Sequence, residues 1–212
     1  MYTNLTNHII MVRHGQAQNN VERRLAGRME GVMLTPEGVR QSEYAAAMLR
    51  PARVSAIYAS PVERADRTAR IISAGCGGVP VVTDERLTEI DMGKFTGMTF
   101  DEVRVEHSDI FAKFYEGDVE IAHKGVETFE QVRRRVTDVV SEVSGLGGNV
   151  VLVTHMDPIK AVLGEVTGMP PERLSRVEIE NAALNVFARV RAGGGRLSLR
   201  ALNLMDTARL AW

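Results

Sequence analysis

The feature that most constrains the fold is an apolar run of strand length, residues 8–12, which ends in Arg13-His14-Gly15. A buried parallel strand is specified by its β-branched and apolar residues, and any turn that contains glycine could follow it. The polar ending is therefore unnecessary for stability, and it indicates a chemical role. Alone it is weak evidence, because short motifs arise by chance and a single histidine is more often structural.

A second apolar run, residues 149–154, ends in the same manner. It leads to His155, and Asp157 and Pro158 follow. Asp is a good helix N-cap, and Pro fits the first position of a helix, so we expect a helix to begin here.

A third run, residues 54–59, leads to Ser60 and Pro61. We again expect a cap followed by proline at the start of a helix. This helix would carry Arg64 in its first turn and Arg67 one turn later. Helix arginines usually form a solvated face, which is the interpretation we favour for Arg67.

Residues that follow the carboxyl ends of parallel strands can meet although they are far apart in the sequence. In open α/β sheets, the crevice beyond these strand ends is where ligands bind. We therefore expect Arg13, His14, Arg64 and His155 to converge. Their positive charges would repel one another without an anion, and a phosphoryl group suits two arginine forks and helix N-termini better than a lone carboxylate.

Several short motifs along the chain together resemble the histidine phosphatase superfamily, in particular its phosphoglycerate mutase-like branch. The resemblance covers nearly the whole chain, and its specificity lies in the order and spacing of the motifs. They are Arg13-His14-Gly15 with Asn20 and Gly27, Leu34-Thr35-Pro36-Glu37-Gly38 with Gln41, Ser60 to Arg64 with Thr68-Ala69, Glu85 to Glu89 with Gly93 and Gly97, Val153-Thr154-His155, and more weakly Asn181-Ala182-Ala183 and Leu202-Asn203.

The resemblance implies a role for each matching residue. His14 would be the nucleophile and Glu89 the proton donor, while Arg13, Asn20, Arg64 and His155 would hold the phosphoryl oxygens. The chemistry is consistent with this, because a neutral imidazole can attack phosphorus and neighbouring cations keep it unprotonated. A carboxylic acid can protonate the departing alcohol and later activate water. Without the resemblance, Glu89 would be interpreted as a surface carboxylate in an acidic loop.

The chain departs from the family in two places. Met156 follows His155, where many members have glycine. After Glu89 the chain has Ile90-Asp91-Met92-Gly93 and lacks the Arg and Tyr that cofactor-dependent mutases place there. The second departure favours a phosphatase over a mutase.

The 212 residues, 44% of them hydrophobic, can bury one sizeable core. We expect an α/β fold in three α/β/α layers, with a mostly parallel central sheet and a single domain over residues 1–212. Residues 92–124 have mixed aromatic and charged character, and we expect them to form a small inserted cap over the crevice at the carboxyl ends of the strands. Within it, helical spacing predicts that Phe111 and Phe114 pack in a small core.

Other elements follow from periodicity and capping. Long helices are expected over residues 36–49, capped by Thr35, and over residues 127–143. Residues 183–190 and 196–202 are expected to form a hairpin of two edge strands.

Charge and cysteine content exclude some classes of function. The formal net charge is −1, so no basic field for nucleic acid is present. Cys76 is the single cysteine and fits a reducing compartment. No signal peptide or membrane-spanning segment is recognisable, so we expect a cytoplasmic protein without a membrane partner. No cofactor is expected, and a homo-oligomer is compatible with the sequence.

The favoured function is that of a metal-independent phosphomonoesterase that hydrolyses a small-molecule phosphate ester through a phosphohistidine. Phosphoserine, sugar phosphates, phosphoglycerate and ribazole phosphate are all compatible substrates. The alternatives are a cofactor-dependent phosphoglycerate mutase-type phosphomutase and a catalytically weak regulatory or binding member of the fold. A zinc site made by His14, His155, Glu89 and Asp157 is a weaker rival, because the spacing matches no known ligand motif.

Overall fold

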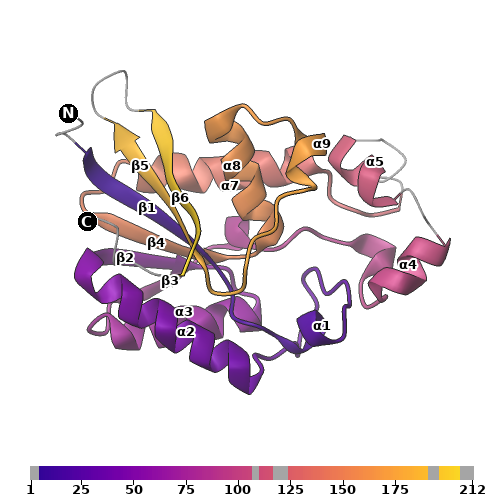
Figure 1. Cartoon of the computed structure of the whole chain (residues 1–212), viewed down its shortest axis with the longest axis horizontal. Helices are drawn as coiled ribbons and strands as arrows, with labels where there is room; N and C mark the ends of the chain where they lie inside the picture. Colours follow the sequence, from indigo (N-terminus) through magenta and orange to yellow (C-terminus); the bar gives the residue numbers. More distant parts are fainter. Residues whose placement is uncertain (1–4, 107–109, 117–123, 191–195, 206–212) are drawn as a thin grey trace.

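A computed structural model describes residues 5–106, 110–116, 124–190 and 196–205 (Figure 1). Its centre is a six-stranded sheet in the order β3-β2-β4-β1-β5-β6. The strands are β1 (Leu5–Arg13), β2 (Val54–Ala59), β3 (Val81–Thr83), β4 (Asn149–Thr154), β5 (Leu184–Val190) and β6 (Leu197–Leu204). The first four of these strands are mutually parallel, whereas β5 is antiparallel to both β1 and β6.

Helices cover both faces of the sheet, which confirms the three-layer α/β/α architecture with a mostly parallel sheet (Figure 1). On one face lie α2 (Pro36–Leu49) and α3 (Glu63–Gly75), and on the other lie α7 (Phe129–Val143) and α8 (Met156–Thr167). The short helices are α1 (Gln18–Val21), α4 (Phe100–Glu106), α5 (Ile110–Glu116), α9 (Pro171–Leu174) and three 3-10 turns, η1 (Arg50–Ala52), η2 (Glu85–Leu87) and η3 (Gly93–Phe95). Each face has its own apolar core, centred on Ile10 and Ile57 beneath α2 and α3 and on Met11 and Leu152 beneath α7 and α8.

The register of the parallel strands brings three chain segments to one edge of the sheet. Arg13 pairs with Thr154, and Ala59 pairs with Val153. The next residues continue this alignment, because His14 N–H donates to the Thr154 carbonyl at 2.9 Å and Ser60 N–H donates to the Val153 carbonyl at 3.0 Å. The carboxyl ends of β1, β2 and β4 therefore meet, as the sequence predicts.

The predicted starts of the two capped helices are wrong by a few residues. The helix α3 begins at Glu63 after Val62, and Ser60 Oγ accepts from Val62 N–H at 3.2 Å without being the N-cap. The helix α8 begins at Met156 with His155 at its N-cap position, so Asp157 lies within the first turn and does not cap it. Pro61 therefore lies before α3 begins, and Pro158 lies in the first turn of α8 at its third residue.

Two other predicted elements also differ. The helix expected to start at residue 127 starts at Phe129, because Thr128 and Gln131 form a capping box, and Glu127 remains outside. The C-terminal hairpin forms, but only β6 is an edge strand, since β5 also pairs with β1 along most of its length. A buried β5 agrees with its mostly apolar sequence, in which Asn185 and Arg189 are the exceptions.

The segment between the sheet strands β3 and β4 contains α4 and α5, which lie beside the sheet near its carboxyl edge (Figure 1). Phe114 of α5 is buried and packs edge-on against Phe129, as predicted for a small core, whereas the side chain of Phe111 lies outside the described residues. Within the described residues, no helix is long and apolar enough to cross a membrane.

Candidate active site

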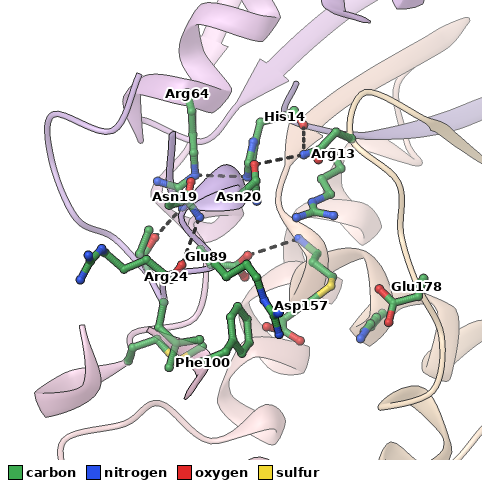
Figure 2. Close-up of a pocket in the computed structure, with 18 of the residues that line it drawn as sticks. Arg13, His14, Asn19, Asn20, Arg24, Arg64, Glu89, Phe100, Asp157 and Glu178 are labelled. Atoms are coloured by element: carbon green, nitrogen blue, oxygen red, sulfur yellow. Dashed lines mark hydrogen bonds between the residues drawn. The ribbon is translucent and has the colours of Figure 1, made fainter. Parts of the chain in front are cut away.

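A cavity of about 520 Å³ opens at the carboxyl ends of β1, β2 and β4 (Figure 2). Side chains from the strand ends, from α1, α3, α5 and α8 and from the connecting loops line it. They are Arg13, His14, Asn19, Asn20, Arg23, Arg24, Leu25, Ala26, Gly27, Arg64, Glu89, Met92, Phe100, Phe114, Tyr115, Met156, Asp157, Lys160, Ser175, Glu178 and Asn181. The structure thus brings together five of the six predicted site residues in one cavity wall.

His14 is held in one tautomer. Its Nδ1 lies 2.7 Å from the carbonyl oxygen of Gly15, and a carbonyl only accepts, so Nδ1 carries the proton. Its Nε2 then keeps a lone pair, which accepts from Nε of Arg64 at 3.2 Å. Burial, with the charges of Arg64 and Arg13, lowers the pKa of His14 well below its ordinary value. His14 is therefore neutral at physiological pH, with Nε2 as its basic and nucleophilic atom.

The backbone turn after His14 requires glycine. Gly15 N–H donates to Thr68 Oγ1 at 3.1 Å, which ties the turn to α3. A Cβ at Gly15 would overlap the carbonyl oxygen of Gly38 and the hydroxyl of Ser42 in α2. The turn is thus packed tightly between two helices, and this packing fixes the direction of the His14 side chain.

Arg64 lies in the first turn of α3, as predicted, and is only 1% exposed. Its Nη2 donates to the Gly27 carbonyl at 2.7 Å and its Nε donates to His14, but Nη1 has no partner. Burial lowers the pKa of Arg64 to about 10, so the guanidinium remains charged at neutral pH. Arg67, by contrast, is exposed, which confirms the interpretation of a solvated helix face.

Unpartnered buried side-chain nitrogens gather around His14. Arg13 Nη1 donates to the Ile179 carbonyl at 2.5 Å, whereas its Nε has no partner. Within the described part of the chain, the buried side-chain nitrogens that lack a partner are Arg13 Nε, Arg64 Nη1 and His155 Nδ1. Leaving a buried donor unpaired costs about 1–3 kcal/mol, and more for charged groups. An anion placed among these atoms would remove that cost.

His155 lies behind His14 rather than on the cavity wall. It is fully buried, and its ring centroid lies 5.1 Å from that of His14. Its Nε2 is 2.9 Å from Ser60 Oγ, so the serine expected to be a helix cap instead holds the second histidine. Burial and the charge of Arg64 lower the pKa of His155 well below its ordinary value, so this imidazole is also neutral.

The side chain of Asn20 and the backbone of Met156 support the site. Asn20 Oδ1 accepts from Ala17 N–H at 2.9 Å and from Asn181 Nδ2 at 3.4 Å, which holds the loop after β1 against the loop before β5. The N–H of Met156 donates to Glu89 Oε2 at 3.3 Å. Met156 therefore positions Glu89 with its backbone donor.

The loop that carries Glu89 is held from several sides. Thr154 Oγ1 donates to the Leu87 carbonyl at 2.6 Å, and Arg135 Nη1 donates to the Thr88 carbonyl at 2.6 Å. Arg28 Nε donates to the carbonyl of Glu89 itself at 3.0 Å. The side chain then points into the cavity with Arg13, His14 and Arg64 (Figure 2).

The environment of Glu89 favours its protonated form. Burial, followed by the negative charge of Asp157, raises the pKa of Glu89 to about 7. The N–H of Ile90, which donates to Glu89 Oε1 at 3.0 Å, and the charges of Arg64 and Arg13 partly offset this rise. A carboxyl group that titrates near neutral pH can serve as an acid and then as a base.

The sequence analysis missed several residues of the far cavity wall, notably Tyr115, Lys160 and Glu178. Lys160 was detectable, because it follows Asp157 by three residues on one helix face and is followed by the apolar residues 161–163. Tyr115 carried no such signal, since helical spacing in its segment predicts only packing, and Glu178 comes from a segment without a clear period.

A metal site receives no support from the geometry. Across the residues that the structure describes, no group of three or more His, Cys, Asp and Glu side chains is arranged to hold a metal ion. The four residues considered as zinc ligands include His155, whose Nε2 is occupied by Ser60.

Comparisons with known proteins show the family of the chain. The family model described as the histidine phosphatase superfamily (branch 1) matches residues 9–204. The 2,3-bisphosphoglycerate-dependent phosphoglycerate mutase of Thermoplasma acidophilum is 34% identical over 94% of this chain and 95% of its own length. Phosphoserine phosphatase 1 of Hydrogenobacter thermophilus is 28% identical over 84% of this chain and 85% of its own length.

The chain is also similar to a solved structure of mycobacterial glucosyl-3-phosphoglycerate phosphatase in complex with VO3, with a TM-score of 0.81 and 25% sequence identity. The match covers 92% of this chain and 98% of the phosphatase chain. The chain therefore belongs to the histidine phosphatase superfamily. The relatives that it resembles carry both mutase and phosphatase names.

Proposed function

We propose that this histidine phosphatase superfamily member is a metal-independent phosphomonoesterase, which hydrolyses a small-molecule phosphate ester through a phosphohistidine on His14. The observation that carries the proposal is the pair of buried, unpartnered guanidinium nitrogens, Arg13 Nε and Arg64 Nη1, beside the lone pair of His14 Nε2. Cations fixed in place before the reaction stabilise charge that develops on phosphoryl oxygens.

In the first step, His14 Nε2 attacks phosphorus in line with the ester oxygen. The N–P bond forms while the P–O bond to the alcohol breaks, and protonated Glu89 gives its proton to the departing oxygen. The Gly15 carbonyl accepts from Nδ1–H and so stabilises the positive charge on the phosphorylated ring. Arg13, Arg64 and the Nδ1 of His155 are the donors proposed for the phosphoryl oxygens, with Asn20 beside them.

In the second step, Glu89 is a carboxylate and accepts a proton from water as the water oxygen attacks phosphorus. The N–P bond breaks, its electron pair returns to His14 Nε2, and inorganic phosphate leaves. Glu89 is then protonated again, so the cycle closes without any external acid or base.

Hydrolysis is favoured over mutase chemistry by the segment after Glu89. Its sequence, Ile90-Asp91-Met92-Gly93, offers neither the Arg nor the Tyr expected of a cofactor-dependent mutase. The similarity to a named phosphoglycerate mutase supports the alternative, a phosphomutase that returns the phosphoryl group to its substrate.

One screen separates these functions. Purified protein would be incubated with chelator and a panel containing phosphoserine, sugar phosphates, 3-phosphoglycerate and ribazole phosphate, and free phosphate would be measured. The proposal predicts phosphate release from at least one ester, abolished by His14→Ala. Conversion of 3-phosphoglycerate to 2-phosphoglycerate, dependent on bisphosphoglycerate and faster than phosphate release, would identify a mutase. Binding without turnover would identify a regulatory protein.

A further inference from the structure

A chain of hydrogen bonds joins three buried polar side chains on the cavity wall. Lys160 Nζ lies 3.1 Å from the Tyr115 hydroxyl, which lies 2.8 Å from Asp157 Oδ1. An ammonium group only donates and a phenol has one proton. The hydroxyl therefore accepts from Lys160 and donates to Asp157. Lys160 is 2% exposed and Asp157 4%, so water does not compete strongly for these bonds.

Asp157 and Glu89 share the N-terminal turn of α8. Met156 N–H donates to Glu89 Oε2, and Asp157 is the next residue along the helix, so both carboxyl groups border the same part of the cavity (Figure 2). Two carboxyl groups that share a buried site do not ionise independently, and a single proton is held preferentially by one of them.

The surrounding charges decide which carboxyl group holds that proton. Burial raises the pKa of Asp157, and this rise is opposed by Lys160 from its own helix, by the Tyr115 hydroxyl from α5, by Arg13 from β1 and by Arg135 from α7. Glu89 is faced by Arg13 from β1, by Arg64 from α3 and by the negative charge of Asp157.

The charged form of Asp157 is therefore stabilised by two groups. The neutral Tyr115 hydroxyl donates a hydrogen bond to it, and the buried Lys160 supplies a positive charge. The cations that face Glu89 are Arg13 and Arg64, and the phosphoryl group of a bound substrate would pair with them in place of Glu89. Once substrate is bound, the balance shifts further towards a charged Asp157 and a protonated Glu89.

We propose that Asp157, kept ionised by Tyr115 and Lys160, is a positioning residue that makes Glu89 the carboxyl group of the pair that carries the proton. The inference rests on the proposed function, in which Glu89 is the proton donor. Asp157 keeps its charge throughout the cycle and exchanges no proton with the substrate. Burial and the charge of Asp157 act in the same direction on Glu89, whose pKa they raise to about 7.

The test is an NMR titration of protein labelled with ¹³C at the glutamate side-chain carboxyls, in which the Glu89 resonance is the one absent from Glu89→Gln. Wild type is expected to titrate near neutral pH at this residue. Asp157→Asn removes a charge without changing shape, and it should lower the Glu89 midpoint by about one pH unit or more. Glu178→Gln is the matched control, because it removes a carboxylate from the cavity wall that acts on Tyr115 and Lys160 but is not among the charges that shift Glu89, so it should move the midpoint much less.

A second readout is the pH profile of kcat/KM for an alkyl phosphate, which requires a protonated donor. The fall in rate on the alkaline side should move to lower pH in Asp157→Asn by the same interval as the NMR midpoint. If the NMR midpoint moves and the rate profile does not follow, the coupling stands, but Glu89 is not the donor and that part of the proposed function fails.

Tyr115→Phe keeps the proposal testable if Asp157→Asn does not fold. Loss of the hydroxyl removes the donor to Asp157, so Asp157 competes for the proton and the Glu89 midpoint should again fall. If either variant folds and its Glu89 midpoint is the same as in wild type, the proposal is overturned, even if wild type is an active phosphatase.

Discussion

At the residue scale, the site depends on keeping one imidazole neutral and correctly oriented among cations. The Gly15 carbonyl fixes the proton on Nδ1 of His14, and Arg64 fixes the ring from the opposite nitrogen. The same arginine that orients His14 also presents an unpartnered Nη1. A phosphoryl group bound there would lie against both the nucleophile and the charge that stabilises the transition state.

Removing Arg64 should therefore affect the rate strongly. Arg64→Ala is expected to lower kcat by roughly two to three orders of magnitude, the scale for loss of one fixed charge-stabilising donor. Steady-state kinetics on the best ester of the panel would measure it. Arg67→Ala, an exposed arginine of the same helix, is the matched control and should change kcat little. A loss of less than about tenfold in Arg64→Ala, or about 1.4 kcal/mol of barrier, would show that the phosphate is held elsewhere.

Glu89→Gln should separate substrates by their leaving groups. An alkyl ester needs protonation as its P–O bond breaks, whereas an activated aryl ester does not, so the first should lose much more phosphorylation rate. Rapid-quench measurement of phosphoenzyme formation would test this. In wild type, the rate for alkyl esters should fall as pH rises through about 7, because Glu89 loses its proton there. Equal losses for both ester types would mean that Glu89 only supports the loop.

At the scale of elements, the site exists because three parallel strands end at the same level and two helices begin there. The turn after β1 is the tightest part of this arrangement. Gly15 lies against the backbone of Gly38 in α2, and Thr68 in α3 accepts its N–H. The small residues Gly38 and Ser42 in the first half of α2 thus allow the strand end to approach closely.

Gly15→Ala is accordingly expected to destabilise the fold by about 1–3 kcal/mol, the usual cost of overpacking, and to reduce activity by displacing His14. Gly147→Ala provides the control, because a Cβ there meets open space. Urea unfolding of both variants would compare them. If the two lose similar stability, the close packing of the turn does not constrain the fold.

The strand ends were predictable because β-branched runs followed by polar residues are a local signal. The convergence of Arg13, His14 and Arg64 followed from the general rule for parallel sheets. The helix starts were less predictable, since the N-caps were assigned from Ser60 and Asp157 whereas backbone geometry chose Val62 and His155. Residues with the chemistry of a helix cap can instead bind site residues, as Ser60 does with His155 and Asp157 does with Tyr115.

The cap region was the least predictable from sequence. Its residues meet the cavity only through tertiary packing, and the contact between Tyr115 and Asp157 joins segments 42 positions apart. No local period distinguishes a tyrosine that packs in a small core from one that holds a carboxylate. The burial of His155 behind His14 could not be predicted either. The end of a strand gives the position of the backbone, but not how deeply the side chain is buried.

At the scale of the whole molecule, the anion site is local. The chain has a formal net charge of −1, yet the cavity wall combines buried Arg64 and partly buried Arg13 with the neutral imidazole of His14. Many surface arginines form ion pairs with neighbouring surface carboxylates, as Arg133 does with Glu130 and Glu165. Attraction for a dianion is therefore expected to be short-ranged and confined to the cavity.

Binding of phosphate should stabilise the native state through this site. At a phosphate concentration about 100 times its Kd, linkage predicts about 2.7 kcal/mol of added stability. Differential scanning fluorimetry should show a rise in Tm with phosphate at constant ionic strength, and little rise in Arg64→Ala. An equal rise in both proteins would place the bound anion outside the cavity.

The most direct test of the account is to find where the phosphoryl group resides during turnover. Wild-type protein would be mixed with ³²P-labelled ester, quenched without acid, digested and sequenced by mass spectrometry. The account predicts phosphate on His14 that is labile in acid and stable in base, and that is absent from His14→Ala although this variant remains folded. Label on another residue, or full turnover by His14→Ala, would contradict it.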